Sequence, residues 1–379
     1  METERDKLTR LLDYLAGSQL ARRGTNADQL HRAALDFERV KRLPIVFSYP
    51  FPEASRFQPL PNGAIYSDPA AMLYNELVSA WGTSIVLGES VGDDLPPSIR
   101  PNWGTVLVAS VLGGHAEQTE DNTPWIRRND DEPISLEKIA EADPNLASAG
   151  WIPRVLETYG TYRDLLGLYP GLKSALHITL PDLQGPLDTV EQLLGADLFV
   201  DMLERPELAA RAFQRTAELQ VACARLFEPY VQDGPGGYAH QHGFMIKGKV
   251  LIRCDSAVMI SPQLYEDLVA PADDLVLSAL GGGGIHSCGR IGHAVPAMLA
   301  LESIRCFDFG QSFMNEVDGL YALARQRRIP FIRVQPTRGE LETGTILERF
   351  PTGVSLLYEA ESMEDAKVIF AGYEEKAES

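Results

Sequence analysis

The chain has 379 residues, of which 45% are apolar and 23% charged, a composition typical of a globular protein. Its formal net charge of −19 argues against nucleic acid and anionic membranes as partners, because both would repel it. Its four cysteines are too scattered for a disulfide framework, no apolar run is long enough to span a bilayer, and the first residues lack the apolar core of a signal peptide. We therefore expect a cytoplasmic protein that acts on a small molecule.

The chain begins with two predicted amphipathic helices, over residues 4–16 and 26–42, in which leucine and alanine recur at helical spacing. A break is expected between them at residues 22–26. Both helices precede the first predicted strand, so residues 1–43 are assigned to an N-terminal helical extension that covers one end of the main domain. Residues 44–379 are assigned to that domain.

Strands and helices are predicted to alternate along the main domain. The predicted strands or extended segments are residues 44–49, 84–87, 105–109, 177–180, 238–246, 249–253, a short run at His286, 303–308, 330–334 and 353–358. The predicted helices are residues 68–81, 135–142, 188–204, 206–230, 261–280, 293–301, 315–328, 339–349 and 363–375. The polar stretch 112–150 is expected to be a long excursion that serves a binding site or a subunit contact.

This alternation indicates parallel strands joined by helical crossovers. A doubly wound open sheet and a closed (β/α)8 barrel both have this pattern. The first strand is not followed by a G-x-G-x-x-G sequence, and the number of units favours the barrel. In a barrel, the residues at the C-terminal ends of the strands form the active site.

The most informative stretch is Gly281–Gly289, in which four glycines precede a short extended segment. His286 and Cys288 lie two residues apart in that segment, so their side chains leave the strand on the same face. A thiolate and an imidazole are half of a tetrahedral zinc site. The alternatives are that both side chains only pack in the core, or that Cys288 is a reactive thiol beside His286.

Other polar residues follow predicted strands. His240 and His242 form a His-x-His pair, with Tyr238 on the same face, and either histidine could line the pocket or lie in an exposed loop. Asp182 and Gln184 follow a strand and are interpreted as pocket-lining groups, although an aspartate there could equally cap the next helix. By position at strand ends alone, the further pocket candidates are Tyr49, Asp255, Ser256, Asp308, Gln335 and Glu359.

Three stretches together resemble the uroporphyrinogen decarboxylase superfamily. They are Asp182-Leu-Gln-Gly-Pro-Leu-Asp188, the Asp255-Ser256 step followed by Ser261-Pro262 and Tyr265, and Gly-Gly-Gly-Ile-His286-Ser-Cys288-Gly289. The resemblance extends from about residue 44 to the end of the chain. It implies a distorted (β/α)8 barrel, and it assigns Asp182, Asp255 and Ser256 to the catalytic pocket.

One branch of this superfamily contains zinc-dependent methyltransferases that move a methyl group between a corrinoid protein and a small acceptor. His286-x-Cys288 resembles the first two zinc ligands of that branch, but the last strand lacks the expected cysteine. Glu359 or His242 is the predicted third ligand. This chain lacks a cobalamin-binding D-x-H-x-x-G sequence, so the resemblance implies that a separate protein carries the corrinoid.

The other branch, the porphyrinogen decarboxylases, needs no cofactor and binds a polycarboxylate. Its N-terminal arginine-rich motif is absent here, and only Arg253 and Arg333 lie near strand ends. The sequence therefore predicts a zinc-assisted methyltransferase first and a cofactor-free decarboxylase second. A barrel that binds a small molecule or a corrinoid partner without catalysis is the third interpretation.

Overall fold

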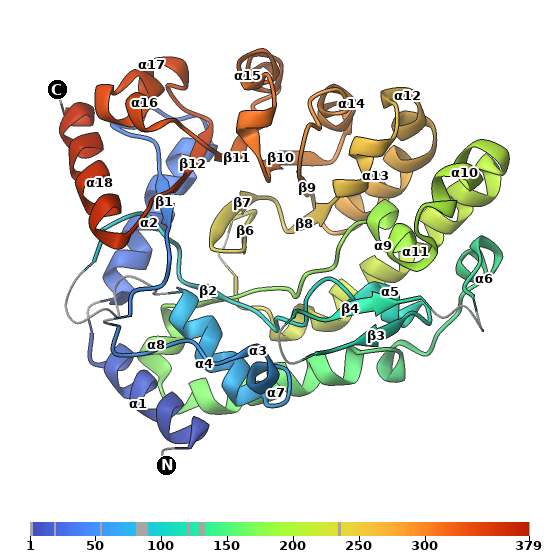
Figure 1. Ribbon diagram of the computed structural model, residues 1–379, viewed down its shortest axis with the longest axis horizontal. Helices are drawn as coiled ribbons and strands as arrows, with labels where there is room; N and C mark the ends of the chain where they lie inside the picture. Colours follow the sequence, from blue (N-terminus) through green and yellow to red (C-terminus); the bar gives the residue numbers. More distant parts are fainter. Residues whose placement is uncertain are drawn as a thin grey trace.

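The protein, described by a computed structural model, is an α/β protein built on a six-stranded parallel sheet (Figure 1). The described residues are 3–18, 20–53, 55–80, 90–119, 122–128, 133–233 and 236–378. In sheet order the strands are β1 (Ile45–Ser48), β12 (Val354–Glu359), β11 (Phe331–Val334), β10 (Ile304–Phe309), β9 (Gly283–Ser287) and β8 (Val250–Arg253). All five neighbouring pairs are parallel, as the alternating pattern predicts.

Three smaller sheets accompany this one. The strands β2 (Ser98–Ile99) and β5 (His177–Ile178) form a parallel pair. The strands β3 (His115–Glu117) and β4 (Trp125–Arg127) form an antiparallel hairpin within the predicted excursion, and β6 (Tyr238–Gln241) and β7 (Phe244–Lys247) form another. Over the described ranges, no ladder of strand hydrogen bonds joins the β2–β5 pair to the six-stranded sheet.

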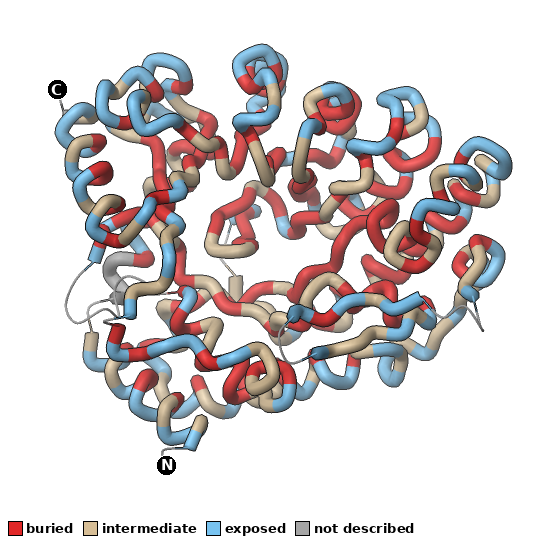
Figure 2. Tube along the Cα trace, viewed as in Figure 1, coloured by how far each residue is buried: buried red, intermediate tan, exposed pale blue. Residues whose placement is uncertain are grey.

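Helices cover the outside of the sheet, with their buried faces turned inward and their exposed faces turned to solvent (Figure 2). They are α1 (Glu4–Ala16), α2 (Leu20–Leu35), α3 (Asn62–Ile65), α4 (Pro69–Ala80), α5 (Leu107–Val111), α6 (Leu136–Ala140), α7 (Ile152–Gly167), α8 (Pro170–Ser174), α9 (Pro186–Leu194), α10 (Asp197–Glu204), α11 (Pro206–Phe227), α12 (Pro262–Leu264), α13 (Ala270–Ala279), α14 (Val295–Ala300), α15 (Val317–Gln326), α16 (Arg338–Thr343), α17 (Thr345–Arg349) and α18 (Met363–Glu378). Among the described helices, none has the length and apolar composition of a membrane span.

The β6–β7 hairpin lies against the inner side of the curved six-stranded sheet (Figure 1). Its turn is His242-Gly243, where φ is 51° and 76°. Two consecutive residues with positive φ are typical of a type I′ turn, and histidine adopts this conformation more readily than most side chains. Residues 238–246 were predicted as one extended segment, so neither this turn nor the hairpin was predicted.

The hairpin packs against the inward-facing side chains of the large sheet. Its apolar residues form one buried cluster with Val46 of β1, Leu251 of β8, Cys306 of β10 and Ile332 of β11. In an ordinary barrel, layers of side chains from the strands alone fill the interior. Here the β6–β7 hairpin covers the inward-facing side chains of the large sheet. The position of β9 facing the hairpin is Gly284, where a Cβ would lie 2.5 Å from the Cys306 Sγ atom.

The N-terminal third of the chain differs most from the prediction. The second helix runs from Leu20 to Leu35 through the predicted break at residues 22–26, and it ends seven residues early. Of the strand predicted at 105–109, residues 107–109 lie in helix α5, whose five residues are all buried. The predicted strand at 84–87 lies outside the described residues.

Three predicted helices are interrupted. The helix expected over 339–349 is divided into α16 and α17 at Gly344, which has a φ of 79°. The helix expected over 188–204 is two helices, α9 and α10, because Gly195 between them has a φ of 66°. The helix expected over 261–280 contains a π-helical turn at Tyr265–Val269 before α13 begins. From β8 onward, the predicted strands and the helices between them lie within a few residues of their observed positions.

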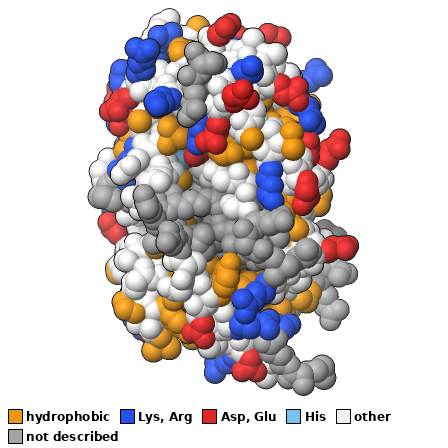
Figure 3. All heavy atoms as spheres, turned by 90° about the vertical axis from the view of Figure 1, so that its left-hand side faces the viewer, with side chains coloured by type: hydrophobic (Ala, Val, Ile, Leu, Met, Phe, Trp, Pro, Cys, Tyr) orange, Lys and Arg blue, Asp and Glu red, His pale blue; other side chains and the backbone are white. Residues whose placement is uncertain are grey.

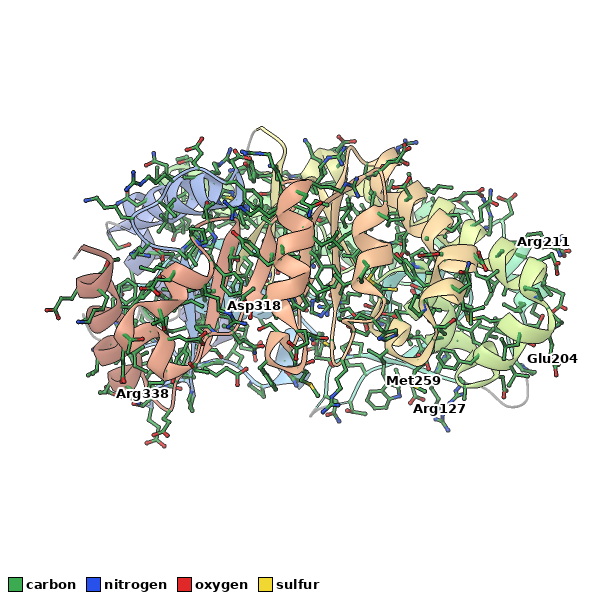
Figure 4. All side chains as sticks on the ribbon, turned by 90° about the horizontal axis from the view of Figure 1, so that it is seen from above. Arg127, Glu204, Arg211, Met259, Asp318 and Arg338 are labelled. Carbon is green, nitrogen blue, oxygen red and sulfur yellow. The ribbon has the colours of Figure 1, made fainter. Side chains whose placement is uncertain are left out.

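The surface is mixed in charge. On the face shown in Figure 3, acidic and basic side chains are interspersed over the described residues. Met259 and Arg338 follow the C-terminal ends of β8 and β11, and both lie along one edge of the molecule in Figure 4. The loops that leave the C-terminal ends of these strands therefore gather on one face.

Candidate metal centre

A layer of polar side chains lies beyond the apolar layer that contacts the hairpin. Arg253, His286 and Asp308 stand in register on β8, β9 and β10, each two residues further along its strand than the position that faces the hairpin. Since successive side chains of a strand point to opposite faces, all three point inward. The Arg333 side chain of β11 also reaches this layer. The backbone of Arg333 has a φ of 57°, next to an irregularity in the β11–β12 register.

Asp308 and Arg333 hold His286 in one orientation. The His286 Nδ1–H donates to Asp308 Oδ2 at 2.9 Å, and Arg333 Nε donates to Asp308 Oδ1 at 2.6 Å. Burial would lower the pKa of His286, but the Asp308 carboxylate raises it to about 9. Burial likewise opposes the charge of Asp308, yet Arg333 and then His286 hold the pKa of Asp308 below its ordinary value.

This orientation turns Nε2 of His286 toward two other possible ligands. The Cys288 Sγ atom lies 3.4 Å from Nε2, and Asp255 Oδ1 lies 3.6 Å from it. The three ligand atoms all lie within 4.8 Å of one another. Zinc bonds of about 2.0 to 2.3 Å in a tetrahedron would separate ligand atoms by roughly 3.3 to 3.6 Å. The separations of Nε2 from Cys288 Sγ and from Asp255 Oδ1 both match this range.

The loop after β8 holds Asp255 in place. The Cys288 N–H donates to Asp255 Oδ1 at 2.7 Å, which joins the ends of β8 and β9. Asp188 accepts the N–H groups of Asp255 and Ser256, each at 2.8 Å. Burial and the nearby Asp255 charge raise the pKa of Asp188 to about 6. The Asp255 side chain is 37% exposed, so the triad is accessible from solvent.

The third member of this cluster differs from both predicted ligands. Glu359 is exposed at the end of β12 and is not part of the cluster. His242 is engaged elsewhere, with Asp182 and two arginines. Asp255, which the resemblance placed in the pocket as a catalytic group, is the third member of this cluster. Asp308, predicted to bind substrate, contacts His286 and Arg333.

A second polar cluster surrounds His242 at the tip of the hairpin. Its Nε2 lies 3.2 Å from Asp182 Oδ2, which also accepts from Arg253 Nε at 2.8 Å. Burial and the Arg100 guanidinium lower the pKa of His242 to about 3, so the imidazole is neutral. Burial opposes the charge of Asp182, but Arg253 holds the pKa of this carboxyl well below its ordinary value. The sequence analysis did not single out Arg100.

The remaining candidates have structural contacts. Gln335 accepts from the Ser312 N–H at 2.9 Å, and its own N–H donates to the Ser312 hydroxyl at 2.7 Å, which ties the end of β11 to the loop after β10. Ser256 contacts Asp188 through its backbone. Tyr49 is half-buried beside the main core.

Gln184 lies behind Asp182. It is 6% exposed, its N–H donates to Asp182 Oδ1 at 3.1 Å, and its φ is 56°. Its carbonyl accepts from Gln220 at 2.7 Å. Its position thus supports the loop that presents Asp182.

His240 belongs to a separate cluster with Asp28, His177 and Asp233. Its Nδ1–H donates to Asp233 Oδ1 at 2.6 Å, and its Nε2 lies 3.5 Å from Asp28. Burial would lower the pKa of His240, but Asp233 and Asp28 raise it. The rings of His177 and His240 stack at 3.7 Å with an interplanar angle of 18°.

The ligand atoms of Asp28, His177 and His240 are close enough together for a metal ion. However, an imidazole binds a metal in its own plane, and two nearly parallel stacked rings have no common in-plane point. We interpret this cluster as an ion-paired contact between α2, β5 and β6.

These features define an α/β protein with a candidate metal-binding triad at the C-terminal ends of its parallel strands. Among solved structures, a methyltransferase from Methanosarcina mazei has a similar fold, with a TM-score of 0.64. The similarity covers 90% of this chain and 96% of that chain, at 15% sequence identity. No protein-family model and no curated protein sequence matches the chain.

Proposed function

We propose that this protein is a metal-assisted methyltransferase in which Asp255, His286 and Cys288 hold a zinc ion. The observation that carries the proposal is the spacing of the three ligand atoms around an imidazole whose other nitrogen is bound by a carboxylate. Metal-binding histidines almost always have such a partner, because it fixes the tautomer and the ring orientation. The fold shared with an archaeal methyltransferase supports the reaction class.

Three protein ligands leave one position of a tetrahedral zinc ion for a substrate. A zinc ion bound there would lower the pKa of a thiol or similar acceptor that occupied this position. In the transfer, a lone pair of the acceptor forms the new bond to the methyl carbon. The bond between that carbon and the donor breaks, and its electron pair stays with the donor. The role of Asp308 and Arg333 is to keep Nε2 of His286 directed at the position of the zinc ion.

The methyl donor in this proposal is a corrinoid carried by a separate protein. It would approach from the face where the loops after β8 and β10 lie. Several apolar side chains of these loops are exposed, with exposed fractions of 68% for Met259, 70% for Phe313 and 41% for Met314.

The arrangement of cations does not favour a decarboxylase of a polycarboxylate. Such a substrate would need several unpaired cations, whereas Arg253 is paired with Asp182 and Arg333 with Asp308.

We also propose that the β2–β5 pair completes a distorted eight-stranded barrel of the uroporphyrinogen decarboxylase type, with residues 1–43 as an extension. Two contacts support this. The Asp94 N–H, just before β2, donates to the Ile45 carbonyl of β1 at 2.9 Å. On the other side, a Cβ at Gly185 would lie 2.0 Å from the Arg253 carbonyl of β8, so the segment after β5 contacts β8 directly. A crystal structure with this pair displaced from β1 or β8 would contradict the closure.

The test is the metal content of the untagged protein and of three variants. We expect about one zinc per chain in the wild-type protein and a loss of metal in Cys288→Ala and Asp255→Asn. Cys306→Ala, a cysteine on the neighbouring strand, is the matched control and should keep its metal. Glu359→Ala should also keep it. A wild-type protein without metal, or metal that persists in Cys288→Ala, would refute the proposed centre.

A further inference from the structure

Arg100, directly after β2, lies beside the proposed centre without a carboxylate partner. Its Nη1 lies 2.6 Å from Nδ1 and 3.0 Å from Nε2 of His242, and its Nη2 donates to Asn102 Oδ1 at 3.3 Å. Over the described ranges, it makes no ion pair with an aspartate or glutamate. The nearest acid, Glu76, already accepts the backbone N–H of Arg100 at 3.0 Å and the Asn102 side-chain N–H at 2.9 Å.

Hydrogen-bond donors outnumber acceptors around His242. Arg100 and Arg253 both direct guanidinium N–H groups at the imidazole. A neutral imidazole has one N–H and one acceptor nitrogen. If Nε2 carries the proton and donates to Asp182, the Arg253 N–H faces another N–H. If Nδ1 carries the proton, the Arg100 N–H faces another N–H. Either tautomer therefore leaves a charged donor unsatisfied.

The charge of Arg253 is balanced by Asp182, and Asp255 and Asp308 also stabilise it. Arg100 differs, because the carboxyl group beside it is Glu76, whose pKa burial raises although Arg100 opposes that shift. A cavity of about 250 Å³ opens beside Arg100, lined also by Glu76, Asn102 and His242 and by three hydroxyl-bearing residues, Ser79, Ser98 and Thr179. This volume is below the roughly 300–1,000 Å³ of sites for drug-sized ligands, so it suits a small group.

We propose that Arg100, with Asn102, forms an anion subsite that binds an acidic group of the substrate, such as a carboxylate, sulfonate or phosphonate. An oxyanion supplies an acceptor for the Arg100 guanidinium group. The assignment of this acidic group to the methyl acceptor rests on the proposed function. Arg253, which contacts the same imidazole as Arg100, stands in register with His286, and this places the subsite next to the triad.

Anion binding has a second consequence, at His242. The two guanidinium groups disfavour protonation of this imidazole, and a bound anion would offset them. The pKa of His242 should therefore rise, and a proton is taken up, when the anion binds.

The experiment measures binding of inorganic sulfate, and separately of acetate, by calorimetry and by the imidazole NMR signals of His242. Arg100→Gln should weaken binding about tenfold or more, because a charge-assisted pair is lost. Arg100→Lys, which keeps the charge, should restore part of it. The matched control is Arg163→Gln, since Arg163 is exposed and pairs with Asp164. Stronger binding of sulfate would indicate a tetrahedral acidic group, and stronger binding of acetate a carboxylate.

The same titration is repeated on metal-free protein and on Cys288→Ala. Sulfate or acetate binding that depends on Arg100 in these samples supports the subsite even if the protein holds no zinc, in which case only the proposed function fails. Equal affinity in the wild-type protein and in Arg100→Gln would overturn the inference. So would anion binding that leaves the His242 pKa unchanged.

Discussion

Gly284 of β9 is the position at which this strand faces the β6–β7 hairpin. A Cβ at this position would lie 2.5 Å from Cys306 Sγ and 2.8 Å from Leu251 Cδ1. Ordinary contacts between such atoms are about 3.5 to 4.0 Å, so both neighbours would have to move by roughly 1 Å. Cys306 is fully buried, and its thiol donates to the Lys247 carbonyl of the hairpin at 3.4 Å. It has little room to move.

Gly284→Ala should therefore lower the free energy of unfolding by about 1–3 kcal/mol, the usual cost of an overpacked core. Denaturant unfolding of four proteins tests the cause: wild type, Gly284→Ala, Cys306→Ala and the double variant. Removing the sulfur should relieve the clash, so the double variant should be at least about 1 kcal/mol more stable than the sum of the single changes predicts. Additive losses would refute the reasoning.

The matched control is Gly339→Ala in helix α16, where a Cβ would meet no atom within 4 Å. This change should leave stability unchanged or raise it by up to about 1 kcal/mol, because alanine is the better helix former. A loss equal to that of Gly284→Ala would mean that glycine replacement itself, and not the contact with Cys306, is responsible.

Two further predictions concern carboxylates. Asp308→Asn should weaken zinc binding by about 10- to 100-fold in a chelator competition while leaving Asp255 and Cys288 in place, and unchanged affinity would exclude the orienting role. Asp273 is buried, accepts from the Tyr265 hydroxyl at 2.8 Å, and has a pKa that burial raises to about 8. Between about pH 4 and 8 the folded state keeps a proton that the unfolded state loses, so this group makes stability fall with rising pH, by up to about 1.4 kcal/mol per pH unit. Asp273→Asn should flatten that decline and be more stable, relative to wild type, at pH 8 than at pH 5, as measured by unfolding at both pH values; an unchanged slope would contradict the raised pKa.

The part of the fold that could be predicted is the part in which local pattern and tertiary role agree. From β8 to α18, short apolar runs alternate with amphipathic segments, and each run is a buried parallel strand. Residues 105–109 show the limit. Their valines favour a strand, but residues 107–109 belong to the buried helix α5, and burial outweighs the weak propensity. The His242-Gly243 turn was missed because histidine is a rare residue in type I′ turns.

The residues of the candidate site were also predictable only in part. His286 and Cys288 lie on one strand, so their spacing predicts that they share a face, and the structure places them together. The third member of the triad depends on how the loop after β8 approaches β9, and no spacing within the chain encodes that approach. Arg100 follows a strand of only two residues between prolines. No sequence pattern marks Arg100, and only the structure shows that it contacts His242.

The β6–β7 hairpin covers the inner side of the large sheet below the polar layer. Because its apolar side chains fill that space, a reactant would reach His286 and Arg100 from the side of the strand C-termini. If two substrates exchange a group there, the substrate that binds first would block the access of the second. A bulky donor protein and a small acceptor could then react only in a fixed order, with the small molecule seated before the large one docks. The product would be released only after the donor protein dissociates.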